Sequence, residues 1–298
     1  MGKAFFDASA SAKARFREAS DLLGKDFARL CFEDPEGTLV QTDNAQPALT
    51  LVSLVAFEVL REEGYVPSVV AGHSVGEYAA LYAAGVCSFA DVMRVVQVRG
   101  RAMKLAAERH PGGMVAVLGL GRDAVSEVCE DVREVGSVEI GNQNSSLQFV
   151  LTGDSDALQQ AADLAMKRGA KRVVPLKVSG PWHSRFMADA QEPLRHALAQ
   201  CEVLAPDIPV IANVTAKEYP AEPAIICENL VAQITRPVLW AQSMSLLVSR
   251  GSLLFVEVGP GKVLSGLLRE ISREARSTNV QDTESLQKFR AARERLLT

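Results

Sequence analysis

The segment at residues 69–85, VVAGHSVGEYAALYAAG, is the part of the chain that most restricts its fold. A short run of branched apolar residues, typical of a buried strand, leads into Gly-His-Ser-Val-Gly, and an alanine-rich helical pattern follows at once. A serine at such a strand–helix junction is typical of the nucleophile elbow of α/β enzymes. Side chains at positions 72 and 76 are expected to crowd the turn, which would explain both glycines. The pattern predicts an α/β fold that lifts Ser74 out at the tip of a strand.

Ser74 has two interpretations at this junction. As a nucleophile, its hydroxyl would face the first amides of the following helix, which can stabilise an oxyanion, and the amide of Val75 is the natural first donor. As an N-cap, the same hydroxyl would only complete a tight link between strand and helix. A nucleophilic serine needs a base within hydrogen-bonding distance, so the first interpretation depends on the histidines.

The chain has four histidines that could act as this base. His73 adjoins Ser74, and neighbouring residues on such a turn point apart. His110 lies in the chain-breaking segment HPGG, and His196 lies on what reads as a polar helix face. His183 lies in VSGPWHSRFM, where glycine, proline and tryptophan follow a strand and can hold a loop rigidly. By elimination, His183 is the candidate base.

Composition argues against several other classes of protein. The net charge of −4 is unlike the basic excess that nucleic-acid-binding domains usually carry. No apolar run approaches the roughly 18–20 residues of a membrane span, and the first residues lack the apolar core of a signal peptide. The five cysteines lack zinc-ligand spacing, and no glycine motif for phosphate binding is present. We expect a cytoplasmic protein without metal, bound cofactor, nucleic-acid partner or membrane partner, and we expect it to be a monomer.

The N-terminal part of the chain reads as helical. Residues 8–31 alternate apolar and charged side chains at helical spacing, and residues 47–63 form a second, strongly apolar helical pattern. Pro47 suits the first turn of that second helix, and Gly64 follows just past its end.

The chain changes its pattern of elements at residue 113. Residues 113–178 read in the order β-α-β-β-α-β, which is that of a ferredoxin-like unit. Longer helices then return, with buried-type strands at residues 209–213 and 253–259. We therefore predict an α/β core made of residues 1–112 and 179–298, with residues 113–178 inserted as a ferredoxin-like α+β subdomain.

Five segments follow one another along the chain: GHSVGEYAAL, VRGRAM, GPWHSRFM, RPVLW and FVEVGPGKVLSGL. Together they resemble the acyltransferases that load malonyl groups from coenzyme A onto acyl carrier protein, and most of all the bacterial malonyl-CoA:acyl carrier protein transacylases of fatty acid synthesis. The resemblance covers nearly the whole chain, the ferredoxin-like insert included. It implies an α/β-hydrolase-like core with a parallel sheet, malonyl-CoA as a substrate rather than a cofactor, and acyl carrier protein as the partner.

The resemblance also implies a role for each site residue. Ser74 would be acylated, and His183 would act first as its base and then as an acid. In this family a backbone carbonyl orients the histidine, and the matching position is Gln233 in AQITRPVLW. Trp182 matches a large aromatic that goes with malonyl rather than methylmalonyl groups, although it could instead only pack the loop.

The malonyl-binding arginine of the family matches Arg99, and the helical pattern bears on that role. Ser88, with an acid three residues later, predicts the N-cap of a helix that reaches about Glu108. Arg99 shares the apolar stripe of this helix with Met103, whereas Arg101 falls on the solvated side. A guanidinium on an apolar face needs a partner, and a substrate carboxylate bound beside Met103 would be one. An internal salt bridge is the alternative.

One feature of the family is missing from this sequence. Its members open with a short strand ending in Gly-Gln-Gly-Ser-Gln, and that glutamine supplies part of the oxyanion hole. Met1-Gly2-Lys3 matches the segment after this motif, so either the sequence was cut or begins too late, or the protein lacks the first strand and its glutamine. Loss of one oxyanion donor typically costs about 10²–10³ in rate. Two alternatives therefore stay open beside the acyltransferase: an α/β-type serine hydrolase or thioesterase, and an inactive relic that only binds a carrier protein.

Two further expectations concern pH and the carrier protein. An unperturbed imidazole titrates near ~6.5, so acylation is expected to rise as the pH passes through that value. Acyl carrier proteins are acidic, which predicts basic side chains near the mouth of the site. Lys177 and Arg185 lie near His183 in the sequence. The basic segment MKRGAKR, residues 166–172, could serve as well or could be only a solvated helix end.

Overall fold

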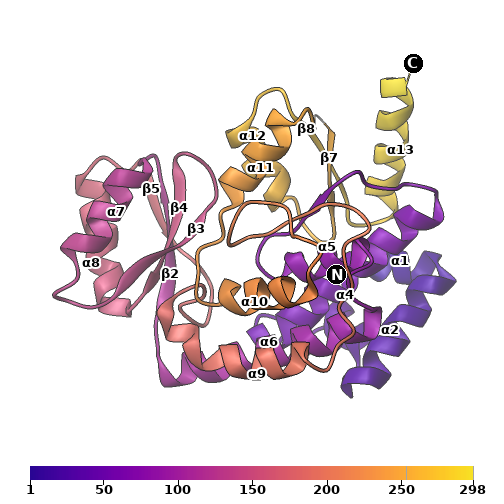
Figure 1. Ribbon diagram of the computed structural model, residues 1–298, viewed down its shortest axis with the longest axis horizontal. Helices are drawn as coiled ribbons and strands as arrows, with labels where there is room; N and C mark the ends of the chain where they lie inside the picture. Colours follow the sequence, from indigo (N-terminus) through magenta and orange to yellow (C-terminus); the bar gives the residue numbers. More distant parts are fainter. Residues whose placement is uncertain (253, 298) are drawn as a thin grey trace.

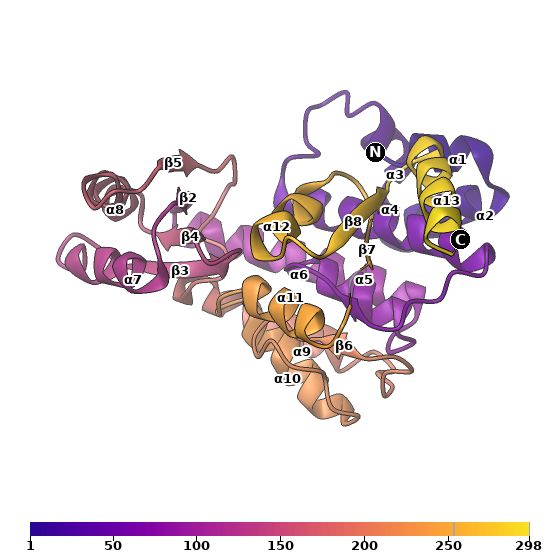
Figure 2. The same cartoon turned by 90° about the horizontal axis from the view of Figure 1, so that it is seen from above.

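The computed structural model describes residues 1–252 and 254–297. It consists of an α/β core and a smaller α+β subdomain, which stands on the left in Figure 1 and again in Figure 2. The chain builds the first part of the core, leaves it for the subdomain and then returns, in the order of elements that the sequence predicts. The division into residues 1–112 with 179–298 and residues 113–178 stays a prediction.

Four helices form the first part of the core: α1 (Lys3–Ala8), α2 (Ala10–Leu23), α3 (Phe27–Phe32) and α4 (Thr42–Glu62). The continuous helical stretch predicted over residues 8–31 is therefore wrong. Ser9 interrupts it because its hydroxyl caps α2 by accepting the amide of Ala12 at 3.2 Å. Gly24 interrupts it again with a left-handed φ of 65°, which ends α2.

Helix α4 begins at Thr42 and not, as predicted, at Pro47. Pro47 therefore lies in the second turn, where it cannot donate a hydrogen bond to the carbonyl of Asp43. The Gln46 amide nitrogen donates to the Thr42 hydroxyl at 2.8 Å and supports this turn from the side chains. The predicted end is confirmed, since Gly64 follows the helix with a left-handed φ of 80°.

Two short parallel ladders carry the core sheet. Strand β1 (Val70–Ala71) pairs with β6 (Val210–Ile211), and β7 (Leu254–Val258) pairs with β8 (Arg276–Val280). The two ladders are not paired with each other within the described chain. They nevertheless face the same two apolar clusters, because Val70 and Val256 pack on one and Ala71 and Phe255 on the other. The ladders thus share one layer, with helices on both faces, as an α/β-hydrolase-like core requires.

Helices α5 (Gly76–Ala83) and α6 (Phe89–Arg109) follow β1. The predicted cap of α6 is confirmed, since the Ser88 hydroxyl accepts the amide of Asp91 at 3.1 Å. The apolar stripe of α6 is buried and includes Arg99, while Arg101 is exposed as predicted. Figure 2 shows α6 running from the core toward the subdomain, where the next strand begins.

The subdomain has the predicted order of elements: β2 (Gly113–Leu118), α7 (Arg122–Asp131), β3 (Val138–Gln143), β4 (Gln148–Gly153), α8 (Ser155–Lys167) and β5 (Arg172–Pro175). Its strands lie in the order β3-β4-β2-β5, and every neighbouring pair is antiparallel. This is the strand order of a ferredoxin-like sheet. The two helices cover one face of the sheet and enclose a separate apolar core around Val117 and Leu151.

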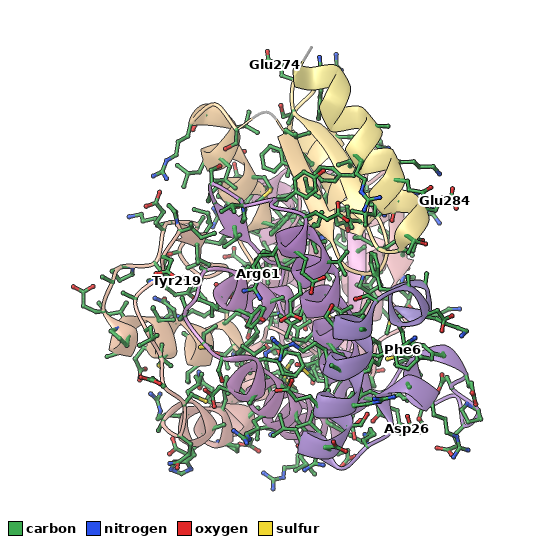
Figure 3. All side chains as sticks on the ribbon, turned by 90° about the vertical axis from the view of Figure 1, so that its right-hand side faces the viewer. Phe6, Asp26, Arg61, Tyr219, Glu274 and Glu284 are labelled. Carbon is green, nitrogen blue, oxygen red and sulfur yellow. The ribbon has the colours of Figure 1, made fainter. Side chains whose placement is uncertain are left out.

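The rest of the core is mostly helical: the 3₁₀ helix η1 (Arg185–Ala190), α9 (Gln191–Leu198), α10 (Pro223–Gln233), α11 (Trp240–Ser249), α12 (Val263–Ile271) and α13 (Thr283–Leu297). Figure 3 faces the side where α13, marked by Glu284, and α1, marked by Phe6, come into contact. None of the described helices combines the length and the apolar character that crossing a membrane would take.

Candidate active site

The turn between β1 and α5 holds Ser74 in a left-handed backbone conformation, with φ of 52°. A Cβ on Gly72 would lie 2.0 Å from the carbonyl oxygen of Gly76, so position 72 accepts only glycine. A Cβ on Gly76 would meet no atom within 4 Å apart from its chain neighbours and the backbone of its own helix. Crowding therefore explains Gly72, but the expectation that it also explains Gly76 is wrong, because a Cβ there points into open space.

The structure brings His183 to Ser74. Its Nε2 lies 2.7 Å from the Ser74 hydroxyl oxygen, and its Nδ1 lies 2.8 Å from the backbone carbonyl oxygen of Gln233. Because that carbonyl can only accept, Nδ1 carries the proton and Nε2 is left to accept from the serine hydroxyl. The Ser184 hydroxyl donates to the carbonyl of Pro181 at 2.6 Å and braces the loop that carries the imidazole. A neutral histidine held in this way can take a proton from Ser74.

The surroundings of His183 disfavour its protonated form. Burial lowers the pKa of His183 to about 3, and the positive charge of Arg99 acts in the same direction. The expectation of a titration near ~6.5 rested on an unperturbed imidazole, and it does not hold in this environment. The ring is therefore neutral, and able to accept a proton, throughout the neutral pH range.

Arg99 reaches Ser74 from α6 and is only 1% exposed. Its Nη1 donates to Oε1 of Gln46 at 2.5 Å, and its Nη2 donates to Oε1 of Gln233 at 2.9 Å. The same Nη2 lies 3.3 Å from the Ser74 hydroxyl oxygen. Its Nε is buried with no hydrogen-bond partner in the described part of the chain. No carboxylate there lies within ion-pairing distance of the guanidinium, although the buried Glu77 acts on it electrostatically from further away. The internal salt bridge, the alternative interpretation of Arg99, is thus not found among these residues.

Two polar residues from other parts of the fold form hydrogen bonds to the backbone of the turn. Asn213, which follows β6, accepts the Ser74 amide on its Oδ1 at 2.7 Å and donates from Nδ2 to the Gly72 carbonyl at 2.6 Å. The Gln233 side-chain nitrogen donates to the Ser74 carbonyl at 3.0 Å. Both are buried, and both are held in turn by the carboxylate of Glu77. The turn is therefore fixed on both of its sides.

The other histidines lie away from the Ser74 hydroxyl. His73 points away from it, as expected, because its Nε2 lies 2.9 Å from Oδ1 of Asn144 and its ring packs 5.4 Å from that of Trp240. Asn144 belongs to the β3–β4 turn, so this contact joins the subdomain to the elbow. His110 and His196 have side chains that are 46% and 76% exposed.

The structure gives different surroundings to the three further residues predicted for the site. The Val75 amide donates to no acceptor in the described chain, whereas the next three amides close turns onto the carbonyls of residues 73–75. Met103 lies on α6 and its sulfur accepts from Nε2 of Gln46 at 3.4 Å. Trp182 is half-buried and packs on the subdomain cluster that contains Met114 and Val150.

Sequence reasoning missed Gln46, Glu77 and Asn213. Gln46 precedes the helix start that the sequence suggested, and Glu77 reads as an ordinary acid in a first helical turn. Asn213 had the best available clue, because it ends the predicted strand at 209–213, and the carboxyl ends of paired parallel strands meet at one edge. In the described residues no cluster of histidine, cysteine, aspartate or glutamate has the arrangement of a metal site.

Known proteins resemble this chain over nearly its whole length. A family model described as the acyl transferase domain matches residues 1–293. The malonyl CoA-acyl carrier protein transacylase of Bacillus subtilis (strain 168) is 40% identical over 288 residues, which are 96% of this chain and 90% of that protein.

Two solved structures agree with this match. Malonyl CoA-acyl carrier protein transacylase from Clostridium perfringens superposes with a TM-score of 0.95 at 34% identity, over 99% of this chain and 93% of that one. A malonyl-transacylase in complex with its type II polyketide synthase acyl-carrier protein superposes with a TM-score of 0.92 at 36% identity, over 96% of this chain and 93% of that one. The similarity thus includes the core and the subdomain.

The two glycines of the elbow should respond differently to substitution. Gly72→Ala forces a Cβ against backbone atoms, so it should lower the free energy of unfolding by about 1–3 kcal/mol and misplace Ser74. Gly76→Ala fills open space in a helical position and should be neutral or stabilising by up to about 1 kcal/mol. Urea unfolding of both variants checks this. Equal destabilisation by the two substitutions would contradict the packing described for the turn.

Proposed function

The chain belongs to the acyl transferase domain family, and we propose from this that it moves a malonyl group from coenzyme A to the phosphopantetheine thiol of acyl carrier protein. The observation that carries the proposal is the chain of contacts from the Ser74 hydroxyl through His183 to the Gln233 carbonyl, with the buried Arg99 beside it. Ser74 and His183 provide a nucleophile with its base, and Arg99 provides a positive charge for an acyl group that ends in a carboxylate.

The reaction consists of two transfers through one serine ester. In the first, the Ser74 oxygen bonds to the thioester carbonyl carbon while Nε2 of His183 takes the hydroxyl proton; the carbon–sulfur bond then breaks, and the imidazolium returns the proton to the departing coenzyme A thiolate. In the second, the phosphopantetheine thiol gives its proton to Nε2 and attacks the ester, and Ser74 recovers its proton as it leaves. The unpaired Val75 amide is the proposed donor to the oxyanion in both steps.

Arg99 is the residue proposed to select the malonyl group. Its guanidinium is held by two neutral amide oxygens, from Gln46 and Gln233, which fix its position without neutralising its charge. One of its nitrogens already lies 3.3 Å from the Ser74 hydroxyl oxygen, so an acyl group on that oxygen is within its reach. A substrate carboxylate would supply the counter-charge through two parallel hydrogen bonds. Trp182 remains the proposed barrier to branched acyl groups.

The alternatives differ in what they do with malonyl-CoA. A hydrolase or thioesterase would release free malonate, and an inactive relic would form no ester. A transferase forms an ester that is stable until a thiol attacks it. The buried charge of Arg99 favours a substrate with a free carboxylate over a neutral ester. We further propose fatty acid synthesis as the pathway, with malonyl-CoA and acyl carrier protein as the only reactants and a monomeric enzyme. Its five free thiols suit the reducing cytoplasm.

Mixing the protein with malonyl-CoA should place a malonyl group on Ser74. Mass spectrometry of the digested protein should find the added mass on the peptide that contains Ser74, and adding acyl carrier protein should remove it to the carrier. Ser74→Ala should abolish the label because, among the residues that the structure describes, no other hydroxyl is paired with His183. A label on another residue, or an undiminished label in the variant, contradicts the assignment. Release of free malonate without the carrier identifies a hydrolase.

Arg99→Ala should change the choice of acyl donor. The kcat/KM for malonyl-CoA should fall by about 10²–10³, because the carboxylate must lose its water without gaining a partner. Acetyl-CoA, which needs no cation, should be accepted better than before, and Arg99→Lys should restore malonyl transfer only in part. Arg101→Ala, two positions along the same helix but exposed, is the matched control. If Arg99→Ala lowers kcat/KM for malonyl-CoA and for acetyl-CoA by the same factor, Arg99 serves the fold and not the substrate.

Lys177 is the basic residue proposed to meet the acidic carrier protein. It is exposed on the loop that leads to His183, whereas Arg185 is already paired with Glu139 and Arg168 with Asp131. Lys177→Glu should raise the KM for acyl carrier protein, more so at low salt, and leave the KM for malonyl-CoA unchanged. Lys171→Glu, which is also exposed but lies at the far end of β5, is the control. If both substitutions change the KM for acyl carrier protein equally, the carrier does not bind specifically at Lys177.

A further inference from the structure

The carboxylate of Glu77 lies beneath the elbow and is fully buried. Oε1 accepts the backbone amide of Asn213 at 2.9 Å and the hydroxyl of Tyr219 at 2.8 Å, and Oε2 accepts from Nε2 of Gln233. These donors come from the segment after β6 and from the end of α10. Glu77 therefore ties together the three parts of the chain that meet at the nucleophile.

Each reacting group of the proposed site is linked to the Glu77 carboxylate through one intermediate residue, either Asn213 or Gln233. Asn213 bonds the backbone on both sides of the Ser74 turn. Gln233 bonds the Ser74 carbonyl and Nη2 of Arg99 with its side chain, and His183 with its backbone carbonyl. The Glu77 carboxylate makes no hydrogen bond to Ser74 Oγ or to His183 in the described structure, so it acts on them through these two residues and through its charge on Arg99.

We propose that Glu77 is a positioning residue, whose ionised carboxylate sets the orientation of the Gln233 side-chain amide and thereby the placement of Arg99 and the Ser74 turn. The identity of the acyl group rests on the proposed function, but the positioning of Ser74 does not.

The orientation of the Gln233 amide follows from the kinds of group around it. An ionised carboxylate only accepts hydrogen bonds, so it holds Nε2 of Gln233 toward itself and toward the Ser74 carbonyl. Oε1 is then left facing the guanidinium of Arg99, which only donates. A protonated Glu77 has a hydrogen to donate, and Gln233 can accept it only by turning its amide over. That turn would set an NH₂ group against Arg99 and an oxygen against the Ser74 carbonyl, and both contacts would be lost.

The charge of Glu77 is poised to change near neutral pH. Burial raises the pKa of Glu77 to about 7, against the lowering effect of its hydrogen-bond donors and of Arg99 on α6. The other titratable groups around it are Tyr219 after β6 and Tyr78 on its own helix. Since the ionised form is the positioning form, acylation should fall as the pH drops through about 7. Protonation of His183 should also stop acylation, but only near pH 3, so the two effects are well separated.

The test is the pH dependence of single-turnover acylation of Ser74 by malonyl-CoA. The wild-type rate should fall on the acid side with a midpoint near 7. Glu77→Gln should react about 10–10² times more slowly than wild type at pH 8 and should lose this midpoint, because its side chain cannot ionise. The gap between the two proteins should close as the pH is lowered, since wild type then becomes protonated.

Tyr219→Phe is the second variant, and it keeps the carboxylate. Tyr219, labelled in Figure 3, lies between β6 and α10 and contacts the carboxylate away from Ser74. Removing its hydroxyl deprives the ionised form of one hydrogen bond, so the midpoint should move up by about one pH unit while the rate at high pH is largely kept. Glu108→Gln removes an exposed carboxylate from α6 and is the control for charge alone.

A merely structural role would lower thermal stability without moving the midpoint. The proposal is overturned if Tyr219→Phe leaves the midpoint in place, or if Glu77→Gln keeps both the wild-type midpoint and the wild-type rate at pH 8. Acylation by p-nitrophenyl acetate provides a readout that does not need Arg99. If malonyl-CoA fails to acylate wild type but this ester shows the same midpoints, the proposed function fails and the role of Glu77 stands.

Discussion

The left-handed turn at Ser74 is the constraint on which the rest of the site depends. A non-glycine residue in this conformation costs on the order of 1–3 kcal/mol unless its surroundings hold it there. Asn213 holds the Ser74 amide and Gln233 holds the Ser74 carbonyl. One follows strand β6 and the other ends helix α10, so the parallel ladder and a distant helix must both be in place before Ser74 can face His183. The position of the Ser74 hydroxyl therefore depends on the same contacts that hold these parts of the fold together.

The features that local patterns determine could be predicted from the sequence. The strand–glycine–serine–helix pattern located the turn at Ser74, and elimination among four histidines led to the one that lies 2.7 Å from it. The cap at Ser88 and the order of elements in the subdomain follow from short-range rules, namely side-chain capping and the period of apolar residues. Arg99 was identifiable as buried because its position on the apolar stripe of α6 is also a matter of local spacing.

What the sequence did not reveal depends on contacts between distant segments. Gln46 and Asn213 are ordinary polar residues until the fold sets them against Arg99 and Ser74, across 53 and 139 positions of sequence. The helix over residues 8–31 was misjudged because Ser9 and Gly24 act singly, against an otherwise continuous pattern. Gly76 shows the converse error, since its place in a known motif suggested a steric need that the packing around it does not contain.

The proposed role of Arg99 would also connect the choice of acyl group with the strength of His183 as a base. Its positive charge is one cause of the lowered pKa of His183, and a base with so low a pKa is far from the best one at neutral pH. A malonyl carboxylate paired with Arg99 would bring a negative charge that offsets this effect and shifts the pKa of His183 back toward its ordinary value. An acetyl group would bring no such charge, and the pKa of His183 would stay low. The same carboxylate that improves binding would then also activate Ser74, so discrimination between the two donors would arise in the chemical step as well as in binding.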